Sequence, residues 1–276
     1  MSNEGVARAG RDARFFLMPR YRIRKHRALK LLFAHLPQRP MAILDIGAGN
    51  ADFLCTLAVE PWVTSAWALD LSPEVVQWVE ELREQLGLEK LHVRQDDFRS
   101  WQPDQQFGLV TLFEVLEHQR DDLAALQRIH VLLEPGGQLL LSVPAQPRLY
   151  STIDELAGHY RRYSRGQLHD LLRRAGFQAL AFASYGFPYT NLLDYGKLVG
   201  TYLLARQLRF SGDMQRQTRH SGQNPFGVAA GVERPWLNWL INRAFPRLLP
   251  LLMPVSRACE RWDLSTGHLW LARKST

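Results

Sequence analysis

Short apolar runs alternate with longer amphipathic segments between residues 41 and 187, and this alternation constrains the fold more than any other feature. The runs with the length and composition of strands are MAILDIG, SAWALDLS, KLHVRQDD, FGLVTLFEV, GQLLLSVPA and ALAFASYGF. Between two of them, residues 72–87 have helical spacing, with Ser72 as a cap and Pro73 at the first helical position. The pattern predicts an α/β fold with a mostly parallel, doubly wound sheet and active groups at the carboxyl ends of its strands.

Composition places broad limits on the chain. Its 276 residues are 46% hydrophobic and 22% charged, which favours an ordinary folded protein. A net charge of +7 favours an anionic partner such as nucleic acid, a phospholipid surface or an acidic substrate. Only Cys55 and Cys259 are present, so we expect neither a disulfide framework nor a zinc site, and a cytoplasmic location. The first 16 residues lack the uninterrupted apolar region of a signal peptide.

The stretch ILDIGAGNADFL contains two glycines behind a predicted strand. Such a turn lets the backbone approach a ligand closely, although a tight strand-to-helix turn alone would also use glycine. A dinucleotide fold requires a third glycine where this chain has Asp52, and Asp45 lies just before Gly47. Asp70, at the end of the next predicted strand, is placed to accept hydrogen bonds from both ribose hydroxyls. We therefore expect a site for an uncharged nucleoside.

With these residues the chain resembles the Rossmann-like, class I S-adenosylmethionine-dependent methyltransferases, in their ubiquinone-biosynthesis-like branch. The family's acid and small residues correspond to Asp45, Gly47, Gly49 and Ala51, and its ribose acid corresponds to Asp70. RQDDFR supplies the adenine contacts, FGLVTLFEVLEH the fourth-strand motif and VLLEPGGQLLLSVP the turn into the fifth strand. Ala51 replaces a glycine, and Gly108 follows Phe107 where the family usually has an aspartate.

The resemblance implies S-adenosylmethionine as the cofactor. The residues it assigns to cofactor binding are Asp45, Gly47, Gly49, Asp70, Leu71, Asp96, Asp97, Phe98, Phe113, Glu114 and His118. Asp97 would face the exocyclic amine of adenine, and Phe98 would flank the ring.

Methyl transfer from a sulfonium requires alignment of the nucleophile and, where the nucleophile carries a proton, its removal. No metal is required in principle, and none is predicted. The candidates for proton transfer are His118, His159 and Tyr160. Either histidine could instead only hydrogen-bond the backbone at a helix start.

The segment STIDELAGHYRRYS follows the fifth predicted strand, from which this fold reaches over its substrate. We expect a lid in which arginines bind an anionic group of the acceptor, although a solvated loop is the plainer alternative. The residues assigned to acceptor binding are Tyr21, Asp154, His159, Arg161, Arg162, Tyr163 and Tyr189.

The resemblance also divides the chain. A basic helical leader occupies residues 1–40, the methyltransferase core residues 41–187, a helical insertion residues 188–264, and the last, antiparallel strand lies in residues 265–276. The insertion's charges and prolines argue against membrane spans. We expect it to wall an apolar substrate chamber, with a peripheral membrane contact or a homodimer contact as alternatives.

These features predict a methyltransferase acting on oxygen of a small, anionic or partly apolar metabolite from quinone, glycolipid or secondary-metabolite biosynthesis. Nitrogen or carbon acceptors are alternatives, as is a protein that binds the cofactor without catalysis. A nucleic-acid methyltransferase is favoured only by the charge, because the fourth-strand segment FEVLEH lacks the aromatic motif of base-modifying enzymes.

Overall fold

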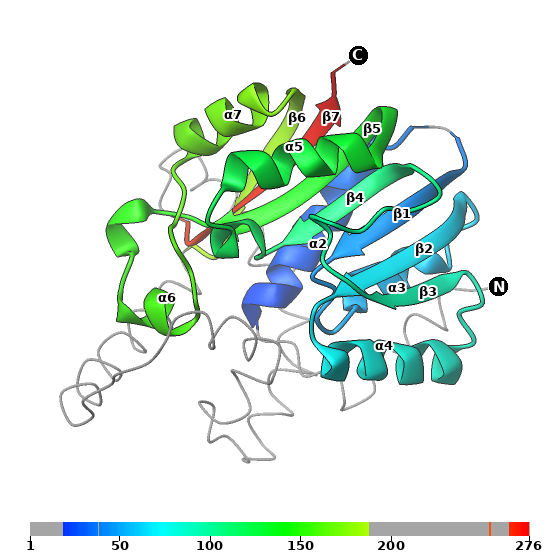
Figure 1. Cartoon of the computed structure of the whole chain (residues 1–276). Coiled ribbons are helices and arrows are strands. Elements are labelled where there is room, and N and C mark those ends of the chain that lie inside the picture. The colour runs from blue at the N-terminus through cyan, green and yellow to red at the C-terminus, as the bar shows by residue number, and fades with distance from the viewer. Residues whose placement is uncertain (1–18, 38, 188–253, 255–264, 276) are drawn as a thin grey trace, which may run out of the picture.

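The computed structural model describes residues 19–37, 39–187, 254 and 265–275. A seven-stranded sheet forms its centre, in the order β3-β2-β1-β4-β5-β7-β6 (Figure 1). The strands are β1 (Met41–Ile46), β2 (Val63–Asp70), β3 (Leu91–Gln95), β4 (Phe107–Phe113), β5 (Leu133–Pro144), β6 (Phe177–Tyr185) and β7 (Gly267–Lys274). Strands β1 to β5 pair in parallel, whereas β7 runs antiparallel between β5 and β6. The predicted Rossmann-like sheet with an antiparallel last strand is confirmed.

Helices cover both faces of this sheet (Figure 1). The α-helices are α2 (Pro19–His35), α3 (Asp52–Ala58), α4 (Pro73–Leu86), α5 (Asp122–Leu132), α6 (Thr152–Leu156) and α7 (Arg165–Arg174). Two short 3-10 helices, η1 (Leu116–His118) and η2 (Pro147–Leu149), follow β4 and β5. Helices α2, α3 and α4 share one hydrophobic core with the sheet, and α5 and α7 share the other.

The strands alternate their side chains between the two cores, as a pleated sheet requires. Ile43 and Leu109 lie in the core under α2, α3 and α4, whereas Leu44 and Val110 lie in the core under α5 and α7. Because both faces are buried, the strands read as nearly continuous apolar runs in the sequence.

The start of α4 follows the sequence prediction closely. The Ser72 hydroxyl accepts a hydrogen bond from the Val75 amide, and Gly87 ends the helix in the left-handed region.

Gly108 has a packing explanation. A Cβ at this position would lie only 2.6 Å from both Met41 Cβ and Glu134 Oε1, so the aspartate that the family usually carries here does not fit.

The predicted basic leader is helical where the structure describes it. Helix α2 packs against β6 and β7 and buries Ile23, Ala28 and Leu32 in the core. Residues 1–18 and, apart from Pro254, the predicted insertion 188–264 lie outside the described residues. The predicted boundaries between the four parts therefore stay predictions. None of the helices in the described ranges is long and apolar enough to cross a membrane.

The packing of α2 can be tested with two neighbouring residues. Leu32 is fully buried, whereas Phe33 is 48% exposed. Leu32→Ala should lower the free energy of unfolding by about 2–5 kcal/mol, because it leaves a cavity between helix and sheet. Phe33→Ala is the control and should change it by about 0.5 kcal/mol or less. Urea denaturation measures both; equal effects would contradict the described packing of α2.

Candidate functional site

The turn between β1 and α3 has an unusual backbone. Gly47, Gly49 and Ala51 all have left-handed φ angles, of 71°, 53° and 52°. Gly47 has a second constraint, because an added Cβ would collide with the Val115 side chain. This turn therefore requires glycine at position 47, while Ala51 adopts a conformation that costs a non-glycine residue roughly 1–2 kcal/mol.

Hydrogen bonds attach this turn to the end of β2. The amides of Gly47 and Ala48 both donate to the Leu69 carbonyl, at 2.8 and 3.3 Å. The Asp70 carboxylate accepts from the Gly49 amide at 3.2 Å and from the Ser72 amide at 3.0 Å. Burial raises the pKa of Asp70, while these backbone bonds lower it in part. The glycine turn after β1 and the end of β2, with Asp70, thus lie together at one edge of the sheet.

Asp45 lies beside this turn and is 4% exposed. Its Oδ1 accepts a hydrogen bond from the Thr111 hydroxyl of β4 at 2.5 Å. Burial raises the pKa of Asp45 to about 7, although the Thr111 bond and the charge of Arg24 lower it, and the Asp70 charge raises it further. Its charge is thus sensitive to pH near neutrality.

Two acids follow β3. The Asp97 carboxylate pairs with the Arg99 guanidinium, which lowers the pKa of Asp97 despite partial burial. Asp96 lies next to it and accepts from Arg94 at 3.3 Å. The Phe98 ring is buried in the core under α5 and α7. Leu71, after β2, is by contrast 60% exposed.

The end of β4 places Phe113 and Glu114 at the same edge. Glu114 adopts a left-handed φ of 56°, which is strained for a non-glycine residue. Its Oε1 accepts hydrogen bonds from the Tyr185 hydroxyl at 2.6 Å and from the Ser142 hydroxyl at 2.9 Å. The side chains of β5 and β6 therefore hold this carboxyl group in place.

Helix α2 adds cations that the sequence reasoning missed. The Arg24 guanidinium carbon lies 4.9 Å from the ring centroids of both Tyr21 and Phe113, and a guanidinium nitrogen lies 3.9 Å from Glu114 Oε1. Lys25 forms an ion pair of 2.7 Å with Asp52 at the start of α3. The basic character of the leader was the signal in the sequence for these contacts. A run of basic residues usually indicates a solvent-exposed surface, so the individual contacts could not be predicted.

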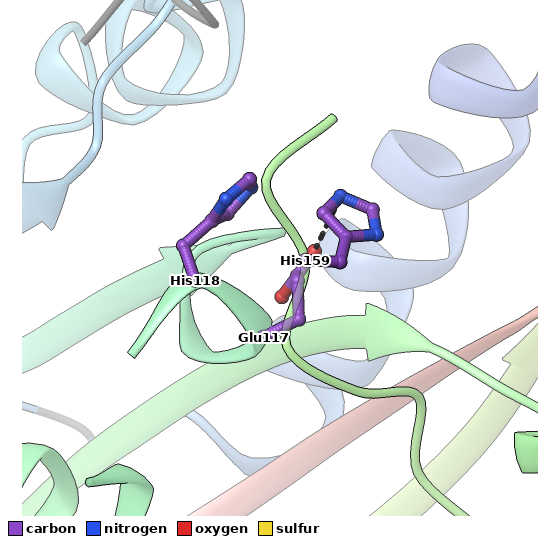
Figure 2. A group of neighbouring side chains, drawn as sticks. All are labelled: Glu117, His118 and His159. Carbon is purple, nitrogen blue, oxygen red and sulfur yellow. Dashed lines mark ion pairs between the residues drawn. The ribbon is translucent and has the colours of Figure 1, made fainter. Parts of the chain in front are cut away.

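The two candidate histidines come together (Figure 2). Their rings contact edge to face, with centroids 4.7 Å apart. His118, in η1, has Nδ1 3.2 Å from the Gly158 carbonyl, so this nitrogen donates. Burial, and next the neighbouring His159, lower the pKa of His118 to about 4, which makes it a weak base at neutral pH.

His159 lies in the loop after α6, directed toward Glu117 (Figure 2). Its Nε2 is 4.0 Å from Glu117 Oε1, and its Nδ1 is 3.0 Å from Asp154 Oδ1. Among the described residues, the ligand atoms of Glu117, His118 and His159 lie within 4.8 Å of one another, a spacing that could hold a metal ion. The sequence had predicted no metal, whereas these distances are compatible with a metal ion.

The other predicted acceptor contacts in this loop have partners within the protein. Asp154 is 2% and Tyr163 3% exposed, so neither side chain presents a surface to a substrate. The Tyr163 hydroxyl donates to Asp122 Oδ2 at 3.1 Å from within the core, which explains its burial. Asp154 links residues of the loop to one another, and Tyr163 anchors the loop to α5. Their predicted contact with the substrate stays a prediction.

The arginine pair is likewise engaged. Arg161 donates to Asp122 Oδ2 at 2.7 Å and to the Arg120 carbonyl at 2.8 Å. Arg162 donates through Nε to Asp154 Oδ1 at 2.8 Å. These contacts favour a structural role for the pair, and their predicted binding of an anionic acceptor stays a prediction.

Two predicted residues remain. Tyr160 is 37% exposed, and its amide donates to the Glu117 carbonyl at 2.8 Å, which ties the loop to η1. Tyr189 lies outside the described residues.

The sequence profile of a family described as a methyltransferase domain matches residues 18–181, which is more than half of the chain. The chain belongs to this methyltransferase family. S-adenosylmethionine is the methyl donor of the family. The match includes helix α2 and the glycine turn, and it ends within β6.

Curated relatives are similar over part of their length. A ubiquinone biosynthesis O-methyltransferase of Pseudomonas syringae pv. tomato is 26% identical over 109 residues, covering 39% of this chain and 47% of the relative. One of Xanthomonas campestris pv. campestris is 33% identical over 102 residues, covering 36% of this chain and 41% of the relative. The chain thus spans less than half the length of these relatives.

A solved structure shares the fold. Phosphoethanolamine N-methyltransferase 2 of Haemonchus contortus, in complex with S-adenosyl-L-methionine, matches with a TM-score of 0.57 and 16% identity. The match covers 91% of this chain and 53% of that protein.

The unusual pKa of Asp45 gives a prediction for the ligand-free protein. Between about pH 4 and pH 7 the folded state holds a proton on Asp45 that the unfolded state has lost, so this group destabilises the fold increasingly as the pH rises. Asp45→Asn keeps the acceptor for Thr111 but carries no charge. It should therefore raise the free energy of unfolding, and more at pH 7.5 than at pH 5.

Urea denaturation at both pH values checks this prediction. His118 titrates in the opposite sense, because its lowered pKa favours the fold as the pH rises, but it does so equally in both proteins. The difference between parent and variant thus isolates Asp45. If the difference in unfolding free energy between parent and variant were the same at both pH values, Asp45 would not be a buried carboxyl group with a raised pKa.

Proposed function

We propose that this chain transfers a methyl group from S-adenosylmethionine to a hydroxyl oxygen of a small-molecule acceptor. One observation carries the proposal. The Asp70 carboxylate is attached to the glycine turn through the Gly49 amide, so a ribose acid and a close-approach backbone lie side by side at the carboxyl edge of the sheet. An open α/β sheet binds its ligand at this edge.

Asp70 and its neighbour Leu71 would together bind the nucleoside part of the cofactor. Asp70 would accept hydrogen bonds from the ribose hydroxyls, since a carboxylate has about four acceptor positions and the backbone amides of Gly49, Leu71 and Ser72 do not fill all of them. Leu71, exposed beside it, would cover one face of the adenine. Replacing Asp70 should therefore greatly weaken the binding of S-adenosylmethionine.

The adenine amine would be held after β3. Asp97 is the acid that the family places there, and Asp96 lies next to it. The Arg99 pair with Asp97 is largely exposed, so it is weakly held and can share the carboxylate with an adenine amine. Phe98 would contribute mainly through its position in the chain, because its ring is buried in the core.

The amino-acid end of the cofactor carries both charges of a zwitterion. The ammonium group would lie at the turn at Gly47, with Asp45 as its carboxyl partner. Arg24, whose guanidinium group lies over the Phe113 ring and near Glu114, would bind the carboxylate. The leader helix would therefore complete the cofactor site.

The reaction needs one proton transfer. The acceptor oxygen forms a bond to the methyl carbon as the carbon–sulfur bond breaks, and the bonding electrons return to sulfur to give a neutral thioether. The hydroxyl proton passes to His159, which is the stronger candidate because the pKa of His118 is lowered to about 4. Tyr160 and His118 would then line the acceptor side.

Oxygen is preferred as the accepting atom for two reasons. A hydroxyl group needs the proton acceptor that the histidine pair offers, and the curated relatives carry the name of ubiquinone biosynthesis O-methyltransferases. A role in quinone, glycolipid or secondary-metabolite biosynthesis follows from the same likeness. The insertion would enclose the acceptor, with contact to a membrane surface or a second copy as alternatives.

Isothermal titration tests the cofactor site. Asp70→Ala should weaken S-adenosylmethionine binding by about tenfold to a hundredfold or more, because two hydroxyl groups lose a charged acceptor. Asp104→Ala, a substitution in the loop between β3 and β4, is the control and should bind like the parent. Unchanged affinity in Asp70→Ala would show that the ribose lies elsewhere.

A further inference from the structure

We propose that Asp154 is a positioning residue that holds His159 in one tautomer, with Nε2 as the nitrogen offered to the acceptor. This inference rests on the proposed function, in which His159 receives the hydroxyl proton. The sequence had placed Asp154 in contact with the substrate, but the side chain is 2% exposed and reaches the reaction only through another residue.

Four donors surround the Asp154 carboxylate. Oδ1 accepts from His159 Nδ1 at 3.0 Å and from Arg162 Nε at 2.8 Å. Oδ2 accepts from the Ser151 amide at 3.0 Å and from the Ser151 hydroxyl at 3.2 Å. Although burial raises the pKa of Asp154, the bonds from His159 and Arg162 outweigh it, and the net shift is downward. The group is therefore ionised and can only accept hydrogen bonds.

An acceptor at this position decides the tautomer of His159. The proton must lie on Nδ1, which leaves the lone pair on Nε2 when the ring is neutral. The backbone reinforces the geometry, because the His159 amide donates to the Asp154 carbonyl at 2.8 Å and the Tyr150 hydroxyl donates to the His159 carbonyl at 2.9 Å. Both the ring and its peptide are thus fixed.

The direction of Nε2 is the functionally important part. It lies 4.0 Å from Glu117 Oε1 in η1, directly after β4, where the proposed site presents the methyl group (Figure 2). The Asp154 carboxylate would stabilise the imidazolium that forms when the proton is taken up. A free histidine on a mobile loop would have neither the tautomer nor the orientation.

The arrangement also refines the acceptor class. A ring that takes up a proton suits a nucleophile that gives up a proton on methylation, such as a hydroxyl group. It suits a carboxylate acceptor poorly, because that nucleophile has no proton to give and would approach the ionised Asp154 with like charge.

Long-range ¹H–¹⁵N NMR correlation of the imidazole rings tests the positioning without an acceptor. His159 is assigned from the spectrum of His159→Asn, and each spectrum is recorded before and after the addition of EDTA. The parent should show Nδ1 protonated and Nε2 unprotonated at neutral pH. Asp154→Ala should shift His159 toward the Nε2-protonated form that a free imidazole favours.

Ser151→Ala is the matched control. It removes a hydrogen bond to the other oxygen of the same carboxylate and loosens the same loop, but it leaves His159 Nδ1 with its acceptor. Its tautomer should match that of the parent. Turnover with catechol as the hydroxyl probe should fall about a hundredfold or more in Asp154→Ala and change little in Ser151→Ala.

Several results would overturn the inference. An Nε2-protonated His159 in the parent would do so even if Asp154→Ala failed to fold. So would an unchanged tautomer in Asp154→Ala, or a parent whose His159 signals show a bound metal that EDTA removes. A parent that binds no S-adenosylmethionine, yet shows the tautomer contrast, would contradict the proposed function and leave the positioning intact.

Discussion

The attachment of the glycine turn to the end of β2 is the interaction on which the candidate site depends. The amides of Gly47 and Ala48 share the Leu69 carbonyl, and the Gly49 amide donates to Asp70. This geometry is possible only because the backbone takes left-handed angles and because position 47 has no side chain to meet Val115. A larger residue at position 47 would separate β1 from η1, and with it the ribose acid from the histidine pair.

The same edge of the sheet is completed by segments from both ends of the described chain. Helix α2 contributes Arg24 and Lys25, which contact Phe113 and Asp52. Strand β6 contributes Tyr185, whose hydroxyl holds Glu114. The loop after β5 contributes His159, held by Asp154. The predicted cofactor residues and the histidine pair therefore lie at the same edge of the sheet.

Much of this arrangement could be predicted from the sequence because it depends on local patterns. Alternating apolar runs indicated the strands, the Ser72 and Pro73 pair indicated the start of α4, and the family resemblance placed the last, antiparallel strand within residues 265–276, where β7 lies. The positions of Asp45, Gly47 and Asp70 at strand ends followed from the same reasoning. Their roles in cofactor binding remain predictions.

Partners distant in the sequence could not be predicted in this way. The sequence predicts anion-binding roles for Arg161 and Arg162 but could not predict that they pair with Asp122 and Asp154. The sequence assigns Tyr163 to acceptor binding but could not predict that its hydroxyl would donate to Asp122, which permits burial of the ring. In the sequence Arg24 is one of many basic residues of the leader, and only the structure shows that its guanidinium group lies over the Phe113 ring. Charged residues are ambiguous in sequence because either water or a buried partner can satisfy them.

Hydrogen–deuterium exchange with S-adenosylhomocysteine as the probe tests the central claim, that one cofactor site spans the carboxyl ends of β1 to β4. The account predicts slower exchange on binding in four separate segments, residues 45–52, 69–72, 96–98 and 113–118, and in α2 around Arg24. Protection confined to other segments, or no protection at saturating ligand, would contradict it.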